Sequence, residues 1–294
     1  MDLKISVITV SLNAEKYIED AIKSVLDQHY KRFEHIIIDA CSTDQTLSIV
    51  KKYPHIKLVS EPDNGQSDAM NKGFRISDGD IIVYLNADDY FLPGAFDRVI
   101  RYFNQGAGFV IGKIKVLSDD GTFWINDPKF TYDEMIRHWE PQAFAVNPVG
   151  YFYQREIQEK TGGFNIHNHY TMDLEFLLEA SLITPFTKVK EETLLGIFRR
   201  TQSSKTLIHE IKNSVMWTNT YWPFIDRFVA TMSPEKRKQY NRARKSGYLS
   251  RQIDQLYKAI KGTGLKEDLS LVKKAGLSFR VLFLYTQKIL LDIN

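Results

Sequence analysis

The stretch Ile81–Tyr90 combines an apolar run with an abrupt polar end, Asn86-Ala87-Asp88-Asp89. An uninterrupted apolar run of this length predicts a strand that is buried on both faces. Carboxylates are too costly to bury within such a strand, so we expect them beyond its carboxyl end, where open α/β sheets bind ligands. Carboxylate and amide oxygens suit Mg²⁺ or Mn²⁺, which often share their ligands with phosphates. These residues predict a metal–diphosphate site; the alternative is a polar loop cap without a metal.

Three earlier apolar runs predict the strands that would position this site. They cover residues 5–10, 33–38 and 56–59, and each is followed by polar residues such as Asn13, Asp39 and Asp63. Helices are expected between them, with Asn13 capping the first, Ser42 or Thr43 capping the second, and the third running over 66–76. This alternation predicts βαβ units and a mostly parallel sheet with its polar strand ends along one edge. The sequence has neither GxxxxGK[ST] nor GxGxxG after its first strand, which argues against a P-loop or dinucleotide site.

Beyond Pro93 the alternation of strands and helices breaks down. Helices are predicted over 95–103, 131–139 and 155–162, strands over 108–116 and 187–198, and a hairpin at 118–122 leading into 123–125. Thr171 is expected to cap a helix that carries Asp173 and Glu175 in its first turn.

Composition and charge divide the chain into two parts. Its 294 residues carry a net charge of +3, but residues 210–294 hold sixteen Lys and Arg against seven Asp and Glu, so the remainder is acidic. We predict a catalytic domain over 1–208 and a basic helical extension over 209–294. The extension is interpreted as a membrane-surface helix or as a cap on the catalytic domain, and not as a nucleic-acid module. Cys41 is the single cysteine, which excludes an internal disulfide and fits a reducing compartment.

The start of the chain and its apolar stretches bear on localisation. Strand-like residues follow Met1 almost at once, so no signal peptide is expected. The sequence has no stretch of about 18 uncharged apolar residues, so no membrane-spanning helix is expected. We therefore expect a cytoplasmic protein, peripheral on the cytoplasmic face of the membrane.

Taken together and in order, the motifs resemble family 2 glycosyltransferases over about residues 3–206. The matching motifs are SVITVSLN at 6–13, IDACSTD at 38–44, SEPDNGQSDAMNKG at 60–73, DGD at 78–80, LNADD at 85–89 and MDLE at 172–175. The resemblance implies a GT-A fold, which is Rossmann-like with helices on both faces of a mostly parallel sheet. It also implies a UDP-sugar donor and inversion at the anomeric carbon.

The resemblance further implies roles for individual residues in donor binding. Thr9, Val10, Ser11 and Asn13 would lie near the nucleoside, and Asp39 would accept the uracil N3–H; its alternative role is to stabilise a helix N-terminus. Further contacts to the ribose or diphosphate are implied for a second group: Asp68, Lys72, Asn86, Ala87 and Arg200. The alternative for Asp68 and Lys72 is a surface ion pair one helical turn apart.

Two carboxylates receive the catalytic roles. Asp88 stands in the DXD position and would bind Mn²⁺ or Mg²⁺, with Asp89 behind it, while Asp173 would be the general base. The alternative for Asp173 and Glu175 is to complement a helix N-terminus, which we favour for Glu175. The sequence departs from the family at Asn86, where Asp is commoner, and at Thr201, where many relatives carry a metal-binding His.

Three function classes follow from these features. The first is a metal-dependent inverting hexosyl- or N-acetylhexosaminyltransferase that uses a saccharide or lipid-linked saccharide acceptor in surface-polysaccharide assembly. A non-catalytic sugar-nucleotide-binding or scaffold protein on the same fold is the second, and a nucleotidyltransferase the third. A group of aromatic residues could form sugar platforms or simply belong to the core: Trp124, Trp139, Tyr151 and Phe152. Arg199 and Lys205 could neutralise phosphate, with Ser203 and Ser204 in a mobile lid.

Overall fold

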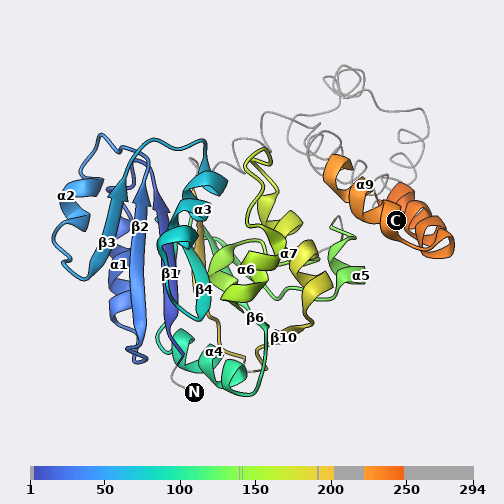
Figure 1. The fold of residues 1–294 in the computed structure, drawn as a ribbon, viewed down its shortest axis with the longest axis horizontal. Helices are drawn as coiled ribbons and strands as arrows, with labels where there is room; N and C mark the ends of the chain where they lie inside the picture. Colours follow the sequence, from blue (N-terminus) through green and yellow to red (C-terminus); the bar gives the residue numbers. More distant parts are fainter. Residues whose placement is uncertain (1–2, 139, 141, 191, 202–221, 248–294) are drawn as a thin grey trace, which may run out of the picture. The chain divides into compact units, whose positions relative to one another are not determined.

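The computed structural model describes residues 3–138, 140, 142–190, 192–201 and 222–247, and the early apolar runs form four neighbouring strands of its larger sheet (Figure 1). This sheet has seven strands in the order β10-β6-β9-β4-β1-β2-β3. The strands are β1 (Ile5–Ser11), β2 (Phe33–Asp39), β3 (Ile56–Ser60), β4 (Ile81–Asn86), β6 (Phe109–Ile111), β9 (Tyr151–Gln154) and β10 (Phe186–Lys188). Neighbouring strands are parallel except β9, which runs antiparallel to both β4 and β6.

The register of the parallel strands brings their polar ends together. Ser11 lies opposite Asp39, Asp39 lies opposite Ser60, and Val10 lies opposite Asn86. The predicted gathering of polar strand ends at one edge is therefore confirmed.

Helices cover both faces of this sheet, as predicted. The helices α1 (Ile18–Leu26), α2 (Thr46–Val50) and α4 (Ala95–Asn104) pack on the face that carries Val7, Ile37 and Phe152. On the other face, α3 (Gln66–Ile76) contacts Ile8 and Ile38, while α6 (Arg155–Thr161) and α7 (Met172–Ile183) lie against the rings of β9. Alternate strand residues serve the two layers, so the strands are apolar throughout.

Segments beyond β4 build a smaller sheet, which the sequence did not predict. Its strand order is β5-β11-β7-β8, from β5 (Tyr90–Phe91), β7 (Ile114–Ser118), β8 (Phe123–Asn126) and β11 (Gly196–Arg200). The single strand predicted over 108–116 is therefore wrong, because the chain changes sheets at Gly112. A Cβ atom at Gly112 would lie 2.6 Å from the Leu195 side chain, so the change of sheet needs glycine. The extended segment predicted over 187–198 divides between the two sheets in the same way.

Helix starts differ from the predicted caps. Helix α1 begins at Ile18, and the side chain of Asn13 instead accepts a hydrogen bond from the Thr43 backbone N–H at 2.9 Å. Helix α2 begins at Thr46, whose backbone N–H and hydroxyl donate to Asp44. The residues predicted as caps tie two loops at the sheet edge to each other. The helix predicted over 131–139 is short, α5 (Tyr132–Met135), and Trp139 lies outside the described residues.

The described residues fall into two compact units. The first comprises 1–138 with 142–212 and contains both sheets; the second comprises 139–141 with 213–294. In the second unit, α9 (Trp222–Thr231) buries Phe224, Ile225 and Phe228, and another helical stretch covers 234–247. The domain boundary predicted at 208/209 and the tail beyond 247 lie outside the described residues. Among the described helices, none is both long and apolar enough to cross a membrane.

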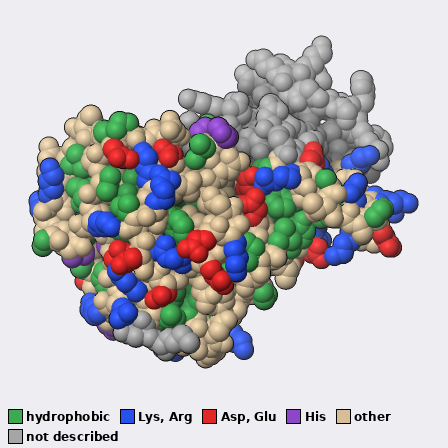
Figure 2. Space-filling model, in the orientation of Figure 1, with side chains coloured by type: hydrophobic (Ala, Val, Ile, Leu, Met, Phe, Trp, Pro, Cys, Tyr) green, Lys and Arg blue, Asp and Glu red, His purple; other side chains and the backbone are tan. Residues whose placement is uncertain are grey.

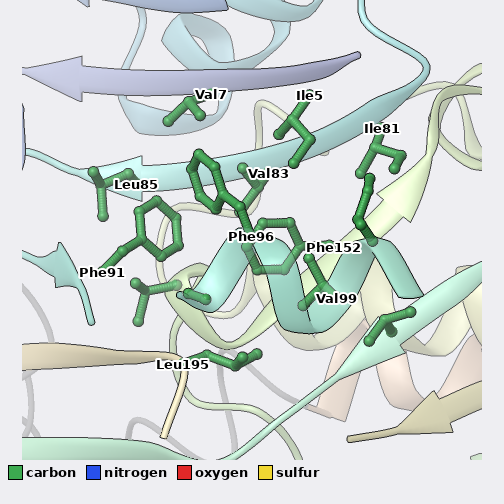
Figure 3. Packing of buried hydrophobic residues seen from close by; sticks show 14 of the residues in the cluster. Ile5, Val7, Ile81, Val83, Leu85, Phe91, Phe96, Val99, Phe152 and Leu195 are labelled. Atoms are coloured by element: carbon green, nitrogen blue, oxygen red, sulfur yellow. The ribbon is translucent and has the colours of Figure 1, made fainter. Parts of the chain in front are cut away.

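The packing of the core against the larger sheet indicates how much one aromatic side chain, Phe96, contributes to stability. Phe96 is fully buried, and its ring lies 5.1 Å from that of Phe91 and 6.0 Å from that of Phe152 (Figure 3). Replacing it by Ala should cost about 3–5 kcal/mol of unfolding free energy, because the cavity cannot close fully. The control is Phe123→Ala, at a side chain 60% exposed, where we expect less than about 1 kcal/mol. Equal shifts of the two urea midpoints would contradict the packing described here.

Candidate active site

A cleft of about 500 Å³ opens at the edge where the parallel strands end. It is lined by five segments: the end of β1 with the following loop, the start of α3, the end of β4, the 146–148 segment, and the start of α7 with the residues before it. Two residues of the β11 region, Phe198 and Thr201, complete the wall. The predicted site residues that line this cleft are Val10, Asn13, Asn86, Ala87, Asp88 and Asp173.

Asp88 offers a carboxylate to the cleft from the turn that follows β4. Burial raises the pKa of this carboxyl, and the Arg199 guanidinium acts in the opposite direction. A half-buried carboxylate of this kind is stabilised in its charged form by a cation bound beside it. Asp88 is therefore suited to hold a positive ion in the cleft.

The neighbouring carboxylate of Asp89 has a structural role. It is fully buried and accepts hydrogen bonds from the Asn86 and Asn147 amides at 3.0 and 2.7 Å, and from the backbone N–H of Arg199 at 2.9 Å. Burial, and next the charge of Asp88, raise the pKa of Asp89 well above its usual value. Both its oxygens accept hydrogen bonds within the protein, so Asp89 fixes the turn that carries Asp88.

Asn86 is fixed by two hydrogen bonds. Its amide nitrogen donates to Asp89, and its amide oxygen accepts from Nε2 of Gln66 at 2.9 Å. The Asn86 oxygen is therefore already paired with a neutral donor. This pairing leaves the Asn86 oxygen less available to a metal ion.

Asp173 reaches the same cleft from the first turn of α7, more than eighty residues further along the chain. Its Oδ1 accepts a hydrogen bond from the Tyr151 hydroxyl at 3.2 Å. The residue predicted as a cap, Thr171, stands at the N-cap position but makes no side-chain cap bond, and its hydroxyl donates to Asn168 instead. The structure thus brings Asp88 and Asp173 to one cleft.

Glu175, in the same turn of α7, faces the interior. It is nearly fully buried and accepts hydrogen bonds from the side-chain amides of Asn165 and Asn168, the closest at 2.8 Å. These bonds tie the loop before α7 to the helix. Glu175 therefore has a structural role, as expected from the sequence.

Three residues predicted to contact the nucleoside lie beneath the cleft surface. Asp39 is fully buried and accepts hydrogen bonds from Ser11, Ser42 and Ser60, so its carboxylate joins the ends of β1, β2 and β3. Thr9 is also fully buried and its hydroxyl bonds to Nε2 of His35. Neither these two residues nor Ser11 lines the cleft. The uracil contact of Asp39 stays a prediction.

Asp68 and Lys72 lie outside the cleft lining, in the network given as their alternative. The Asp68 carboxylate accepts from the Asn64 backbone at 3.0 Å, while Lys72 Nζ donates to the Pro62 carbonyl and pairs with Glu61 and Asp68. The Asn64 hydrogen bond lowers the pKa of Asp68. The helix geometry accounts for this placement: Gln66 lines the cleft, and a residue two positions later is turned by about 200° around the helix axis. The contacts of Asp68 and Lys72 with the ribose or diphosphate stay a prediction.

Arg199 and Arg200 also lie outside the cleft lining, and their contacts with a diphosphate stay a prediction. The Arg199 guanidinium bonds to Asp20 at 2.7 Å and lies over the rings of Tyr17 and Tyr90. It therefore joins the smaller sheet to α1 and does not line the cleft. Arg200 does not line the cleft either, whereas Thr201 does. Lys205, Ser203 and Ser204 lie outside the described residues.

Several cleft residues were not found from the sequence. They are Leu12, Ala14, Lys16, Tyr17, Gln66, Val146, Asn147, Pro148, Tyr170, Met172 and Phe198. Gln66 lies within a recognised motif and Lys16 shortly after another, which was the available signal, but their side-chain directions depend on where α3 and α1 begin. Tyr151 and Phe152, considered as sugar platforms, are fully buried, whereas Trp124 is 42% exposed.

The residues at the end of β4 could hold a divalent cation through a single carboxylate. Across the described part of the chain, no group of three or more His, Cys, Asp and Glu side chains is placed to hold a metal. Asp88 is thus the carboxylate offered by this edge, since Asp89 and Asn86 are engaged within the protein. A site with one carboxylate suits Mg²⁺ or Mn²⁺ that takes its remaining ligands from a bound diphosphate and water.

Several named glycosyltransferases are similar to this chain in sequence. The chain is 32% identical over 144 residues to the putative teichuronic acid biosynthesis glycosyltransferase TuaG of Bacillus subtilis, covering 46% of this chain and 57% of that protein. It is 24% identical over 224 residues to the Escherichia coli glucosyltransferase WfaP, which acts between UDP-Glc and α-D-GlcNAc-diphosphoundecaprenol, covering 73% of this chain and 84% of WfaP. The chain thus spans little more than half of the length of some relatives, 53% for one from Nostoc.

Solved structures show the same fold. Residues 1–349 of Staphylococcus aureus TarS, in complex with UDP, align with a TM-score of 0.55 at 18% identity, covering 82% of this chain and 79% of that one. The mannosyltransferase PcManGT from Pyrobaculum calidifontis, in complex with GDP-Man and Mn²⁺, aligns with a TM-score of 0.56 at 16% identity, covering 96% and 83%. The predicted GT-A fold is therefore confirmed.

A model of a protein family matches more than half of the chain. The model of glycosyl transferase family 2 matches residues 6–174, which run from the first strand to the residue after Asp173. This range contains Asp88 and Asp173, the two carboxylates that meet in the cleft. The chain therefore belongs to glycosyl transferase family 2.

Proposed function

We propose that this protein is a metal-dependent inverting glycosyltransferase that moves a sugar from a UDP-sugar to a saccharide acceptor. The observation that carries the proposal is that Asp88 and Asp173, far apart in sequence, line one cleft. Its volume of about 500 Å³ is within the range of cofactor and substrate sites. A UDP-sugar donor is supported by the TarS structures in complex with UDP and UDP-GlcNAc and by the name of WfaP.

The proposed chemistry divides the work between the two carboxylates. Asp173 takes the proton of the acceptor hydroxyl while the oxygen of that hydroxyl forms a bond to the anomeric carbon. The bond from that carbon to the diphosphate oxygen breaks on the opposite side, so the configuration is inverted. Asp88 holds the cation, which when bound neutralises charge on the departing diphosphate.

The relatives' names support a proposal about the acceptor and about where in the cell the protein works. TuaG is named for teichuronic acid biosynthesis, TarS for poly(ribitol-phosphate), and WfaP for a diphosphoundecaprenol-linked sugar. We propose a saccharide acceptor, lipid-linked as for WfaP, in assembly of a cell-surface polysaccharide. The protein would then work in the cytoplasm, at the inner membrane surface.

Replacing Asp88 by Asn should weaken Mn²⁺-dependent binding of UDP by at least about tenfold, because the amide keeps the shape but loses the charge that holds the cation. Isothermal calorimetry with UDP, with and without Mn²⁺, measures this effect. Asp68→Asn is the matched control, since Asp68 lies outside the cleft lining, and its affinity should equal that of the wild type. Undiminished binding by Asp88→Asn with Mn²⁺ would rule out the role given to this residue.

Replacing Asp173 by Asn should lower transfer about 100- to 10,000-fold, because the amide cannot accept the acceptor's proton. UDP affinity should be unchanged. UDP release from a panel of UDP-sugars, in the presence of candidate acceptor saccharides, measures turnover. Activity equal to the wild type would exclude Asp173 as the base. Absence of turnover in the wild type with every donor, together with tight UDP binding, would favour the non-catalytic sugar-nucleotide-binding alternative.

The second unit supports a separate proposal about the membrane. The helical stretch 234–247 exposes the cations Lys236, Arg237, Lys238, Arg242 and Lys245 (Figure 2). We expect the full chain to sediment with vesicles that contain phosphatidylglycerol and not with pure phosphatidylcholine, because clustered Lys and Arg are attracted to anionic lipid. Charge reversal at Lys236, Lys238 and Lys245 should abolish sedimentation. Equal binding of both proteins would contradict an electrostatic contact.

A further inference from the structure

Strand β9 carries two tyrosines, Tyr151 and Tyr153, whose surroundings are nearly the same. Two residues apart, they lie on the same face of the sheet, and both are fully buried. Both rings stack with Phe109, at centroid distances of 5.7 and 5.3 Å. Burial raises the pKa of both phenols well above the usual value, so both hydroxyls stay protonated and act as donors at neutral pH.

The two hydroxyls differ in the group to which they donate. Tyr153 donates to Oε1 of the buried Gln158 at 2.7 Å, an oxygen that also accepts from Tyr84. Tyr151 donates to Oδ1 of Asp173 at 3.2 Å. The Tyr153 hydroxyl therefore bonds to a neutral amide in the interior, whereas the Tyr151 hydroxyl bonds to a carboxylate that lines the cleft.

We infer that Tyr151 is a positioning residue for Asp173, holding its carboxylate in a fixed orientation toward the cleft and favouring its charged form. The inference rests on the proposed function, in which Asp173 is the base. A donor that is itself immobile gives a carboxylate a defined plane, as supporting residues do for catalytic groups in general. Tyr151 meets this condition, because β9 is hydrogen-bonded on both sides, to β4 and β6.

The pairing also has an electrostatic consequence. A hydrogen bond from a neutral donor stabilises the carboxylate over the protonated acid. Removing the hydroxyl while keeping the ring would therefore favour protonation of Asp173. It would leave packing nearly unchanged, because Phe fills the same space as Tyr apart from one oxygen atom.

In the described part of the chain, charged and titratable groups lie on the cleft side of Asp173 and on the elements that surround it. On the cleft side these are Asp88, Lys16, Tyr17, His169 and Tyr170, which line the same cleft. From β9 and β4 they are Tyr151, Tyr153 and Tyr84. On α7 they are Glu175 and Glu179; the packed helices α5 and α6 and the residues beside them add Asp133, Glu134, Arg137, His138, Arg155, Glu156, Glu159 and Lys160. Tyr151→Phe and Tyr153→Phe leave all these other groups in place.

The experiment compares Tyr151→Phe with Tyr153→Phe in the full chain. Aspartate is labelled with ¹³C at Cγ, the Asp173 resonance is assigned from Asp173→Asn, and its shift is followed as pH is varied. We expect the titration midpoint of Asp173 to move to higher pH in Tyr151→Phe and to match the wild type in Tyr153→Phe. Introducing 3-fluorotyrosine at position 151, a stronger donor that keeps the ring, should move the midpoint to lower pH.

Turnover gives the second measurement, with UDP release from UDP-glucose and UDP-GlcNAc as the probe. In Tyr151→Phe, kcat should fall about tenfold, as expected for one hydrogen bond to a charged group, with the donor KM unchanged. The acidic limb of the kcat/KM profile should move to higher pH. Tyr153→Phe should keep the wild-type profile. In the Asp173→Asn background, Tyr151→Phe should cause no further loss.

The outcomes separate this inference from the proposed function. Identical titration of Asp173 in the two Phe variants, or a fluorotyrosine shift toward higher pH, would overturn the inference. Full activity of Asp173→Asn would instead overturn the role of Asp173 as base, whatever the titration shows. Should Tyr151→Phe fail to fold, the fluorotyrosine protein still decides the question, because its ring and hydroxyl are both retained.

Discussion

The fully buried carboxylate of Asp89 joins the three parts of the chain that surround the cleft. It accepts hydrogen bonds from Asn86 at the end of β4, from Asn147 before β9, and from the Arg199 backbone on β11 of the smaller sheet. Burying an unpaired charge would be strongly destabilising, whereas one that is fully hydrogen-bonded can be tolerated. These bonds therefore require the three segments to be in place together, and Asp88, one residue earlier, is fixed with them.

This arrangement places two carboxylates with different supports at one cleft. Asp88 stands on the turn after β4, where burial raises the pKa of its carboxyl, so a cation bound beside it would favour the charged form. Asp173 begins a helix whose preceding loop is tied down by Glu175, and its Oδ1 accepts from Tyr151. Separate supports allow one group to bind a positive ion and the other to accept a proton in the same space.

Features carried by local patterns were predictable from the sequence. The apolar runs gave β1 to β4, their register gathered the polar ends, and the motifs pointed to Asp88 and Asp173. Features that depend on tertiary contacts were not predictable. The chain leaves the larger sheet at Gly112, where a Cβ atom would crowd the Leu195 side chain. The Asn13 side chain bonds to the Thr43 backbone where a helix cap was expected. Asp68 and Gln66 are two residues apart, so only the exact start of α3 decides which of them faces the cleft.

The most direct test of the central claim is a crystal structure of the protein with UDP and Mn²⁺, with anomalous diffraction data collected at the manganese edge. The claim predicts an anomalous peak between the carboxylate of Asp88 and the diphosphate, with Asp173 facing the open side of the same cleft. A peak away from Asp88, or UDP bound outside the cleft that these two residues share, would contradict it.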